Sequence, residues 1–280
     1  MQNNKKIFFT IFLIIFCNGL KAQDALKTQF NFAKTLYENE KYFDAITELK
    51  RLIFFDSSKT YFYEANKIIG DCYKMGGKFS EAILYYANSE NAAISDSEIF
   101  DERINQIRVN ILRRTTDRAL MMLDNLSSDK RFLNKINCIN YWKGWSYIFS
   151  DDWEKAANAF AKTDSSSKLV AFCKEVHSKK YSISFATLIS HFIPGAGQIY
   201  AGHIWSGLLS LGWNVLWGYT SINAFIDNRI FDGIIVSDLL WLRFYIGNIQ
   251  NAEKFSKEEN LSITNSALHF LQFEYRGVKP

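Results

Sequence analysis

The chain has 280 residues, 48% of them hydrophobic and 22% charged, and its formal net charge is +4. Three lysines lie in the first 23 residues, so the rest of the chain carries only about +1, too little positive charge to favour nucleic acid as a partner. The length and apolar content exclude a disordered chain and predict two modules.

The N-terminus has the pattern of a secretory signal peptide. Lys5 and Lys6 precede an apolar run from Ile7 to Cys17, and the small residue Ala22 offers a cleavage point. An uncleaved membrane anchor is the alternative, but the run is short for a span, which needs about 20 apolar residues. Residues 1–22 are therefore predicted to direct export and to be removed.

A repeat organises residues 24–180. Alanines recur at intervals of 37 residues, and each is followed four positions later by a large apolar residue. These alanines are Ala45, Ala82, Ala119 and Ala156. Small residues let the two helices of a pair approach, and large residues fill the space between successive pairs. The pattern predicts an all-α module of about four helix pairs, closed by a capping helix over Ser167 to His177.

Two copies of the repeat carry a recognisable motif. Ile69-Gly70-Asp71-Cys72-Tyr73, followed by Ala82 and Tyr86, is the clearest copy. The residues predicted to pack the pairs are Ala45, Gly70, Tyr73, Ala82, Tyr86, Ala119, Gly144, Tyr147, Ala156 and Phe160. This pattern resembles the tetratricopeptide repeat, although the period is longer and the third copy places Ile107 where a small residue belongs. The resemblance implies a curved TPR-like solenoid whose groove holds a protein or peptide.

The composition changes abruptly after the repeat. Between Tyr181 and Ile226 the chain has no Asp, Glu, Lys or Arg. Ser182 to Ile193 is apolar but short, as in an interfacial or re-entrant helix. Ile204 to Ile226 would make about 34 Å of helix, enough to cross a bilayer. Residues 181–252 are therefore predicted to form a membrane-associated helical hairpin.

The second arm of that hairpin carries charges. Ile230 to Ile246 is apolar but includes Asp232, Asp238 and Arg243, so its crossing is marginal, and an interfacial helix is the alternative. Asp238 and Arg243 are the intramembrane polar candidates. Asp238 is expected to face the first arm and to find a hydrogen-bond partner there, for which Gln198, Asn214 or a serine would serve.

A glycine-rich motif precedes the first arm. Its residues are Pro194, Gly195, Gly197, Gln198, Tyr200, Gly202 and Gly207. The motif resembles bacterial domains of unknown function related to the two-helix TM2 membrane domain. The resemblance implies a membrane location and a compact hairpin, and it implies no agreed activity. Residues 253–280 are predicted to be a polar tail with an amphipathic helix.

Catalytic and metal-binding patterns are missing from the sequence. The cysteines that follow the signal, Cys72, Cys138 and Cys173, form no Cys-x-x-Cys pair and are interpreted as buried apolar residues, with one disulfide as the alternative. The four histidines show no ligand spacing. We therefore expect no enzyme, no cofactor and no metal, and no small-molecule substrate is identified.

The sequence favours a scaffold in the bacterial cell envelope. Its solenoid would face the periplasm and bind a protein or peptide, and its hairpin would hold it in the lipid bilayer. The alternative is a small transporter or channel component, in which Asp238 and Arg243 serve a substrate or proton path and the solenoid regulates it.

Overall fold

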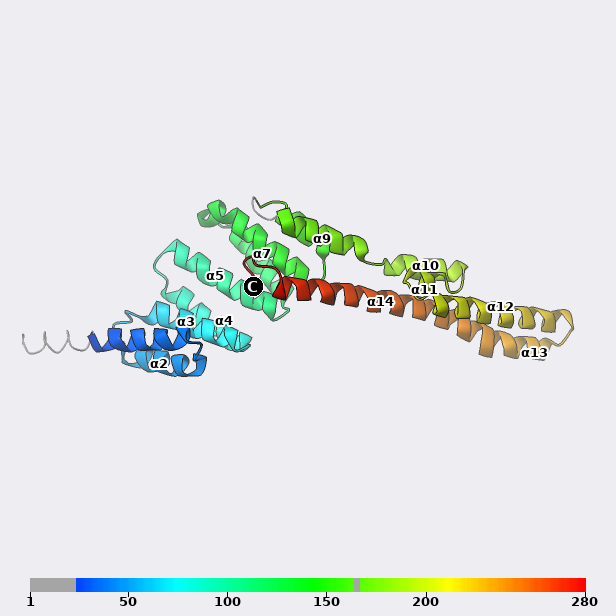
Figure 1. Ribbon diagram of the computed structural model, residues 1–280, viewed down its shortest axis with the longest axis horizontal. Helices are drawn as coiled ribbons and strands as arrows, with labels where there is room; N and C mark the ends of the chain where they lie inside the picture. The colour runs from blue at the N-terminus through cyan, green and yellow to red at the C-terminus, as the bar shows by residue number, and fades with distance from the viewer. Residues whose placement is uncertain (1–23, 164–166) are drawn as a thin grey trace, which may run out of the picture. The chain divides into compact units, whose positions relative to one another are not determined.

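The computed structural model describes residues 24–163 and 167–280 (Figure 1), and the predicted signal peptide lies outside these ranges. Every regular element in the described residues is a helix, which confirms the all-α prediction. A helix over residues 24–38 comes first. The elements that follow are α2 (Tyr42–Phe55), α3 (Phe62–Met75), α4 (Phe79–Ala92), α5 (Asp96–Leu112), α6 (Thr116–Ser128), η1 (Lys130–Lys135), α7 (Ile136–Phe149), α8 (Trp153–Phe160), α9 (Ser167–Lys179), α10 (Ile183–Phe192), α11 (Ala196–Tyr200), α12 (Ile204–Ile226), α13 (Ile230–Ile235), η2 (Val236–Trp241) and α14 (Leu242–Phe273).

The chain divides into two compact units. The first runs to Val170 and includes Lys279–Pro280, and the second is Ala171–Val278. The division falls within α9, ahead of the boundary that the sequence predicts at residue 180. The predicted capping helix therefore passes into the second unit, where Phe172 of α9 stacks on Phe270 of α14 at 4.9 Å between ring centres.

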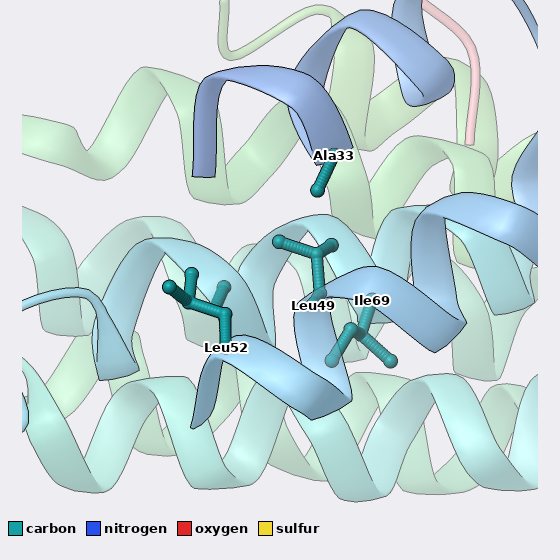
Figure 2. Close-up of a cluster of buried hydrophobic side chains, with 5 residues drawn as sticks. Ala33, Leu49, Leu52 and Ile69 are labelled. Atoms are coloured by element: carbon teal, nitrogen blue, oxygen red, sulfur yellow. The ribbon is translucent and has the colours of Figure 1, made fainter. Parts of the chain in front are cut away.

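In the first unit, consecutive helices from α2 to α8 pack on one another, and α5 also contacts α7. Figure 2 shows the core of its N-terminal helices, where Ala33, Leu49, Leu52 and Ile69 converge. All four side chains are buried. They come from three helices, the one over residues 24–38, α2 and α3, so no single helix could bury this cluster alone.

The same turn joins the two helices of each pair. In the turn between α3 and α4, Gly77 has a φ of +69°, its N–H donates to the Lys74 carbonyl at 3.0 Å, and the Lys78 N–H donates to the Tyr73 carbonyl at 2.8 Å. These two bonds are those of the Schellman motif, which pairs the free carbonyls at a helix end. The corresponding left-handed residues of the other pairs are Glu40, Arg114 and Asp151. The turn therefore recurs at intervals of 37 residues, in step with the alanine repeat.

Small residues lie against large side chains of the paired helix. A Cβ added at Gly70 would lie 2.8 Å from the Tyr86 ring, and one added at Gly144 would lie 2.5 Å from Cζ of Phe160. The four alanines of the repeat are fully buried. Tyr73 is half-buried, as is Tyr147. These contacts are closer than any side chain at the two glycines would allow, which explains why glycine stands there.

In the second unit, α10, α11, α12 and α14 pack together, and α12 also contacts α13 and η2. The Schellman turn recurs here at Gly202, before α12, and at Asn228, between α12 and α13. The second apolar run continues from α13 through the π-helical η2 into α14, so the predicted polar tail is largely the C-terminal part of one long helix.

No helix in the described ranges combines the length and the apolar character that a bilayer crossing requires. The predicted crossing by Ile204–Ile226 is therefore wrong. The helix α12 has the predicted bounds, but serine, glycine, asparagine and threonine residues interrupt its apolar side chains.

Candidate functional site

Asn248 of α14 is the centre of a buried hydrogen-bond network in the second unit. Its Oδ1 accepts from the backbone N–H of Gly195 at 2.5 Å and from the Ser210 hydroxyl at 3.2 Å. Its Nδ2 donates to the Ser190 carbonyl at 2.9 Å, and Gln198 donates to the Asn248 carbonyl at 3.4 Å. One amide side chain thus connects α10, the loop after it, α11, α12 and α14.

The predicted motif supplies the other side of this network. The Gly197 N–H donates to Oγ of Ser190 at 3.0 Å, and the Ser206 hydroxyl donates to Oε1 of Gln198 at 2.8 Å. The Tyr200 hydroxyl accepts from the backbone N–H of Ser182, which precedes α10, at 3.1 Å. The structure therefore brings most of the motif residues together around one buried loop that begins at Pro194. Gly202 is exposed in the turn before α12.

Two glycines of the motif leave no room for a side chain. Gly195 has a φ of +91°, and a Cβ there would lie 2.1 Å from the carbonyl oxygen of Gly207. A Cβ at Gly197 would lie 2.1 Å from the carbonyl oxygen of Ala186. Backbone atoms cannot move aside as a flexible side chain can, so both positions require glycine.

Between α10 and the start of α14, several polar side chains of the second unit are buried and many large apolar side chains are exposed. On α12 the buried side chains are small or polar, among them Asn214 and Ser221. We use the name apolar belt for the exposed apolar side chains of α10, α12, α13, η2 and the start of α14. Its most exposed members include Phe192, Trp205, Leu209, Tyr219, Phe231 and Leu239. This distribution is the reverse of that in helices whose apolar stripe packs into a core.

The expected position of Asp238 is wrong. Asp238 is exposed, and it is the preceding residue, Ser237, that faces α12 and hydrogen-bonds to Ser221. Gly233 and Ser237 lie one turn apart on the side of the helix that contacts α12, so the next residue points away from it. Arg243 is exposed as well.

A second cluster of polar groups lies on α3 and α5 of the first unit. Glu102 of α5 has no exposed surface, accepts from the Tyr63 hydroxyl at 3.1 Å and lies 3.8 Å from Nζ of Lys67. Asp71 of α3 accepts from the Tyr86 hydroxyl at 2.6 Å. We call these residues, together with Lys74 and Arg108, the α3–α5 polar cluster.

The cluster includes two cationic groups close to Asp71, and Nη2 of one of them, Arg108, donates to the Lys279 carbonyl at 3.0 Å. Burial, with a further contribution from the nearby Arg108, lowers the pKa of the Lys74 ammonium to about 8, although Asp71 opposes the shift. Nε of Arg108 is buried and has no hydrogen-bond partner among the described residues. The Arg108 guanidinium lies over the Trp142 ring at 5.1 Å.

The cysteines do not form a reactive site. Cys72, Cys138 and Cys173 are free thiols, so the alternative of a disulfide finds no support. Burial raises the pKa of the Cys72 and Cys173 thiols to about 12, which leaves almost no thiolate at neutral pH. Within the ranges that the structure describes, no three metal-binding side chains converge.

The sequence analysis did not identify Asn248 or the charged residues of the α3–α5 polar cluster. Asn248 is separated from the motif by the whole of α12, and its only signal is an amide beside Gly247 in an otherwise apolar run. The charged residues of the α3–α5 polar cluster look like ordinary solvated helix positions in the sequence. Comparison of the chain with protein families, with characterised proteins and with solved structures finds no match.

We predict that Asn248→Ala loosens the loop around the motif. A buried polar group left without its partner costs about 1–3 kcal/mol, and this change affects the Gly195 amide and the Ser190 carbonyl together. Amide hydrogen exchange of the full chain should accelerate at least ~10-fold in residues 190–202, since about 1.4 kcal/mol corresponds to one factor of ten.

The matched control is Asn251→Ala, at an exposed position of the same helix. It should leave exchange in residues 190–202 unchanged. Equal protection in the Asn248 and Asn251 variants would show that the amide network does not hold the loop.

We also predict that Glu102→Gln stabilises the protein at neutral pH. Burial raises the pKa of the Glu102 carboxyl, although its hydrogen-bond donors and Lys67 oppose the rise. The folded chain therefore retains this proton to a higher pH than the unfolded chain, and wild-type stability falls as pH rises from the ordinary carboxyl pKa through the raised one. Glutamine removes that loss.

Thermal unfolding of the full chain, followed by circular dichroism, tests this expectation. The midpoint of Glu102→Gln should exceed that of wild type at about pH 8 and approach it at about pH 4, close to the unperturbed carboxyl pKa. Glu81→Gln, at an exposed position of α4, is the control and should show no pH-dependent difference. A lower midpoint for Glu102→Gln at pH 8 would mean that the Lys67 interaction outweighs burial.

Proposed function

We propose that this protein is a membrane-associated scaffold of the bacterial cell envelope. Its second unit lies in lipid through the apolar belt, and its first unit is a TPR-like solenoid that faces the periplasm and holds a protein or peptide. Contact with lipid does not require either arm of the second unit to cross the bilayer.

The observation that carries this function is the reversed polarity of the second unit. Trp205 is 81% exposed and Phe231 74% exposed, whereas Gln198 and Asn248 are buried. In water such a surface would be costly, because exposed apolar area is unfavourable by about 25 cal/mol per Å². In lipid that cost disappears, and small and polar residues are the side chains that pack helices against one another there.

The aromatic side chains of the belt fit the same environment. Trp205 and Tyr219 are strongly exposed, and both residue types favour the region between lipid headgroups and hydrocarbon. The charges at the turn between α12 and α13 are paired with one another. Arg229 lies 3.3 Å from Asp227 and 3.6 Å from Asp232. This pairing lowers the cost of placing the turn at a membrane surface.

The first unit supports the partner-binding part of the function. The recurring Schellman turns give successive helix pairs the same local geometry, as stacked repeats require. The α3–α5 polar cluster contains Lys74 and Arg108, and an acidic group of a peptide or protein would neutralise them. Charges buried beyond the needs of folding are common at binding sites, because binding and stability place different demands on a side chain.

The alternative function, a transporter or channel component, has less support. A polar path between the arms would need Asp238 to point inward, and Asp238 is exposed. The polar side chains that do lie inside, such as Gln198 and Asn248, hydrogen-bond to one another and to the loop. Their arrangement is that of a structural network.

Liposome flotation of the full chain tests the lipid contact. The wild type should float with phospholipid vesicles, and Trp205→Glu combined with Phe231→Glu should strongly reduce the floating fraction, because each carboxylate would have to leave water. The control combines Phe43→Glu with Phe54→Glu, two side chains of α2 that are each 81% exposed. Equal flotation of the belt variant and the control variant would refute contact through the belt.

Photo-crosslinking tests the partner contact. A photoreactive amino acid in place of Lys67, beside the α3–α5 polar cluster, should capture a defined partner in cells. The same amino acid in place of Glu81, at an exposed position of α4, should not. Capture of the same partner with equal yield from both positions would contradict a binding face on α3 and α5.

A further inference from the structure

Two opposite charges interrupt the apolar belt away from its turn. Asp238 of η2 and Arg243 of α14 are both exposed. The side chains around them are exposed and apolar: Ile235, Leu239, Leu242 and Ile246. This part of the belt is a continuous apolar stripe with one acidic and one basic side chain on it.

Neither charge has a partner in the part of the chain that the structure describes. Within residues 24–163 and 167–280, no ion pair or hydrogen bond involves Asp238 or Arg243. The charges at the nearby turn differ, because Arg229 pairs with both Asp227 and Asp232. Lipid solvates an unpaired ion poorly, so a chain that lies in lipid through this belt needs a counter-charge at each of the two positions.

We propose that a second copy of this chain supplies both counter-charges. This inference rests on the proposed lipid contact of the belt. Two copies that enter the membrane from the same side can be related by a two-fold axis along the membrane normal, which places the same stripe of each copy face to face. Asp238 of each copy then pairs with Arg243 of the other, and the apolar side chains between them pack together.

The spacing of the two residues suits this arrangement. They are five positions apart, which is at most about 7.5 Å along the axis at the α-helical rise of 1.5 Å per residue. In two parallel helices at the same height, the long arginine side chain spans this offset, as it does in the interhelical ion pairs of parallel coiled coils. The two ion pairs are equivalent, and together they neutralise Asp238 and Arg243 of both copies.

Charge reversal on separate copies gives a decisive test. Asp238→Arg produces a copy with two basic side chains, and Arg243→Asp produces a copy with two acidic side chains. Either variant alone presents like charges to its own kind, so its dimer fraction in vesicles should fall well below that of wild type. A mixture of the two variants restores both pairs, and it should return the dimer fraction to the wild-type level.

The measurement is energy transfer between full-length chains labelled with donor and acceptor dyes in phospholipid vesicles. Gln250→Arg, at an exposed position of α14, is the control for added charge and should dimerise like wild type. The mixture also excludes pairing within one chain, since neither variant can form an internal ion pair between positions 238 and 243.

The outcomes separate this inference from the function on which it rests. A wild-type chain that fails to float with vesicles overturns both. A wild-type chain that floats but shows no energy transfer overturns the dimer alone. Variants that each dimerise as well as wild type, or a mixture that does not recover, also overturn the dimer.

Discussion

The ends of helices leave backbone amides and carbonyls without partners, and the chain meets this constraint by more than one means. At the Schellman turns of both units, the N–H groups of a left-handed residue and of the residue after it return to the preceding helix, and no side chain is needed. Between α10 and α11 the turn is buried, and the side chains of Asn248 and Ser190 bind its amides. Because Asn248 comes from α14, pairing these amides also fixes where α14 packs.

The polar interior of the second unit has a direct effect on its surface. The buried residues of α12 are small or polar, and most of its large apolar side chains are exposed. Aromatic rings add to the packing, since Trp213 of α12 stacks on Phe244 of α14 at 5.6 Å between ring centres. Packing by small residues brings the backbones close and gives many van der Waals contacts. It leaves the large apolar side chains exposed. The lipid contact proposed above would cover them.

Local patterns predicted the elements better than the contacts between them. The alanine repeat gave the helix pairs, and the uncharged run gave α12 with its observed bounds. Two further predictions needed information that spacing lacks. The sequence predicts that Asp238 faces α12. In the structure η2 is π-helical, and Ser237 is the residue that hydrogen-bonds to α12. The crossing of Ile204–Ile226 was predicted from the absence of charge, but uncharged polar residues also lower apolar character. Neither Asn248 nor Glu102 stands out locally, because their partners come from distant helices.

The recurring turn also bears on the order in which the chain folds. A Schellman turn closes through residues only a few positions apart, and each helix of the first unit packs mainly on its neighbours in sequence. Contacts of this kind form early, because little chain entropy is lost in closing short loops. The Asn248 network joins residues that are more than 50 positions apart, as the Gly195 and Ser190 contacts show. During synthesis the helix pairs can therefore assemble one after another, whereas the buried loop at Gly195 must wait, with its amides still in water, until α14 has been made.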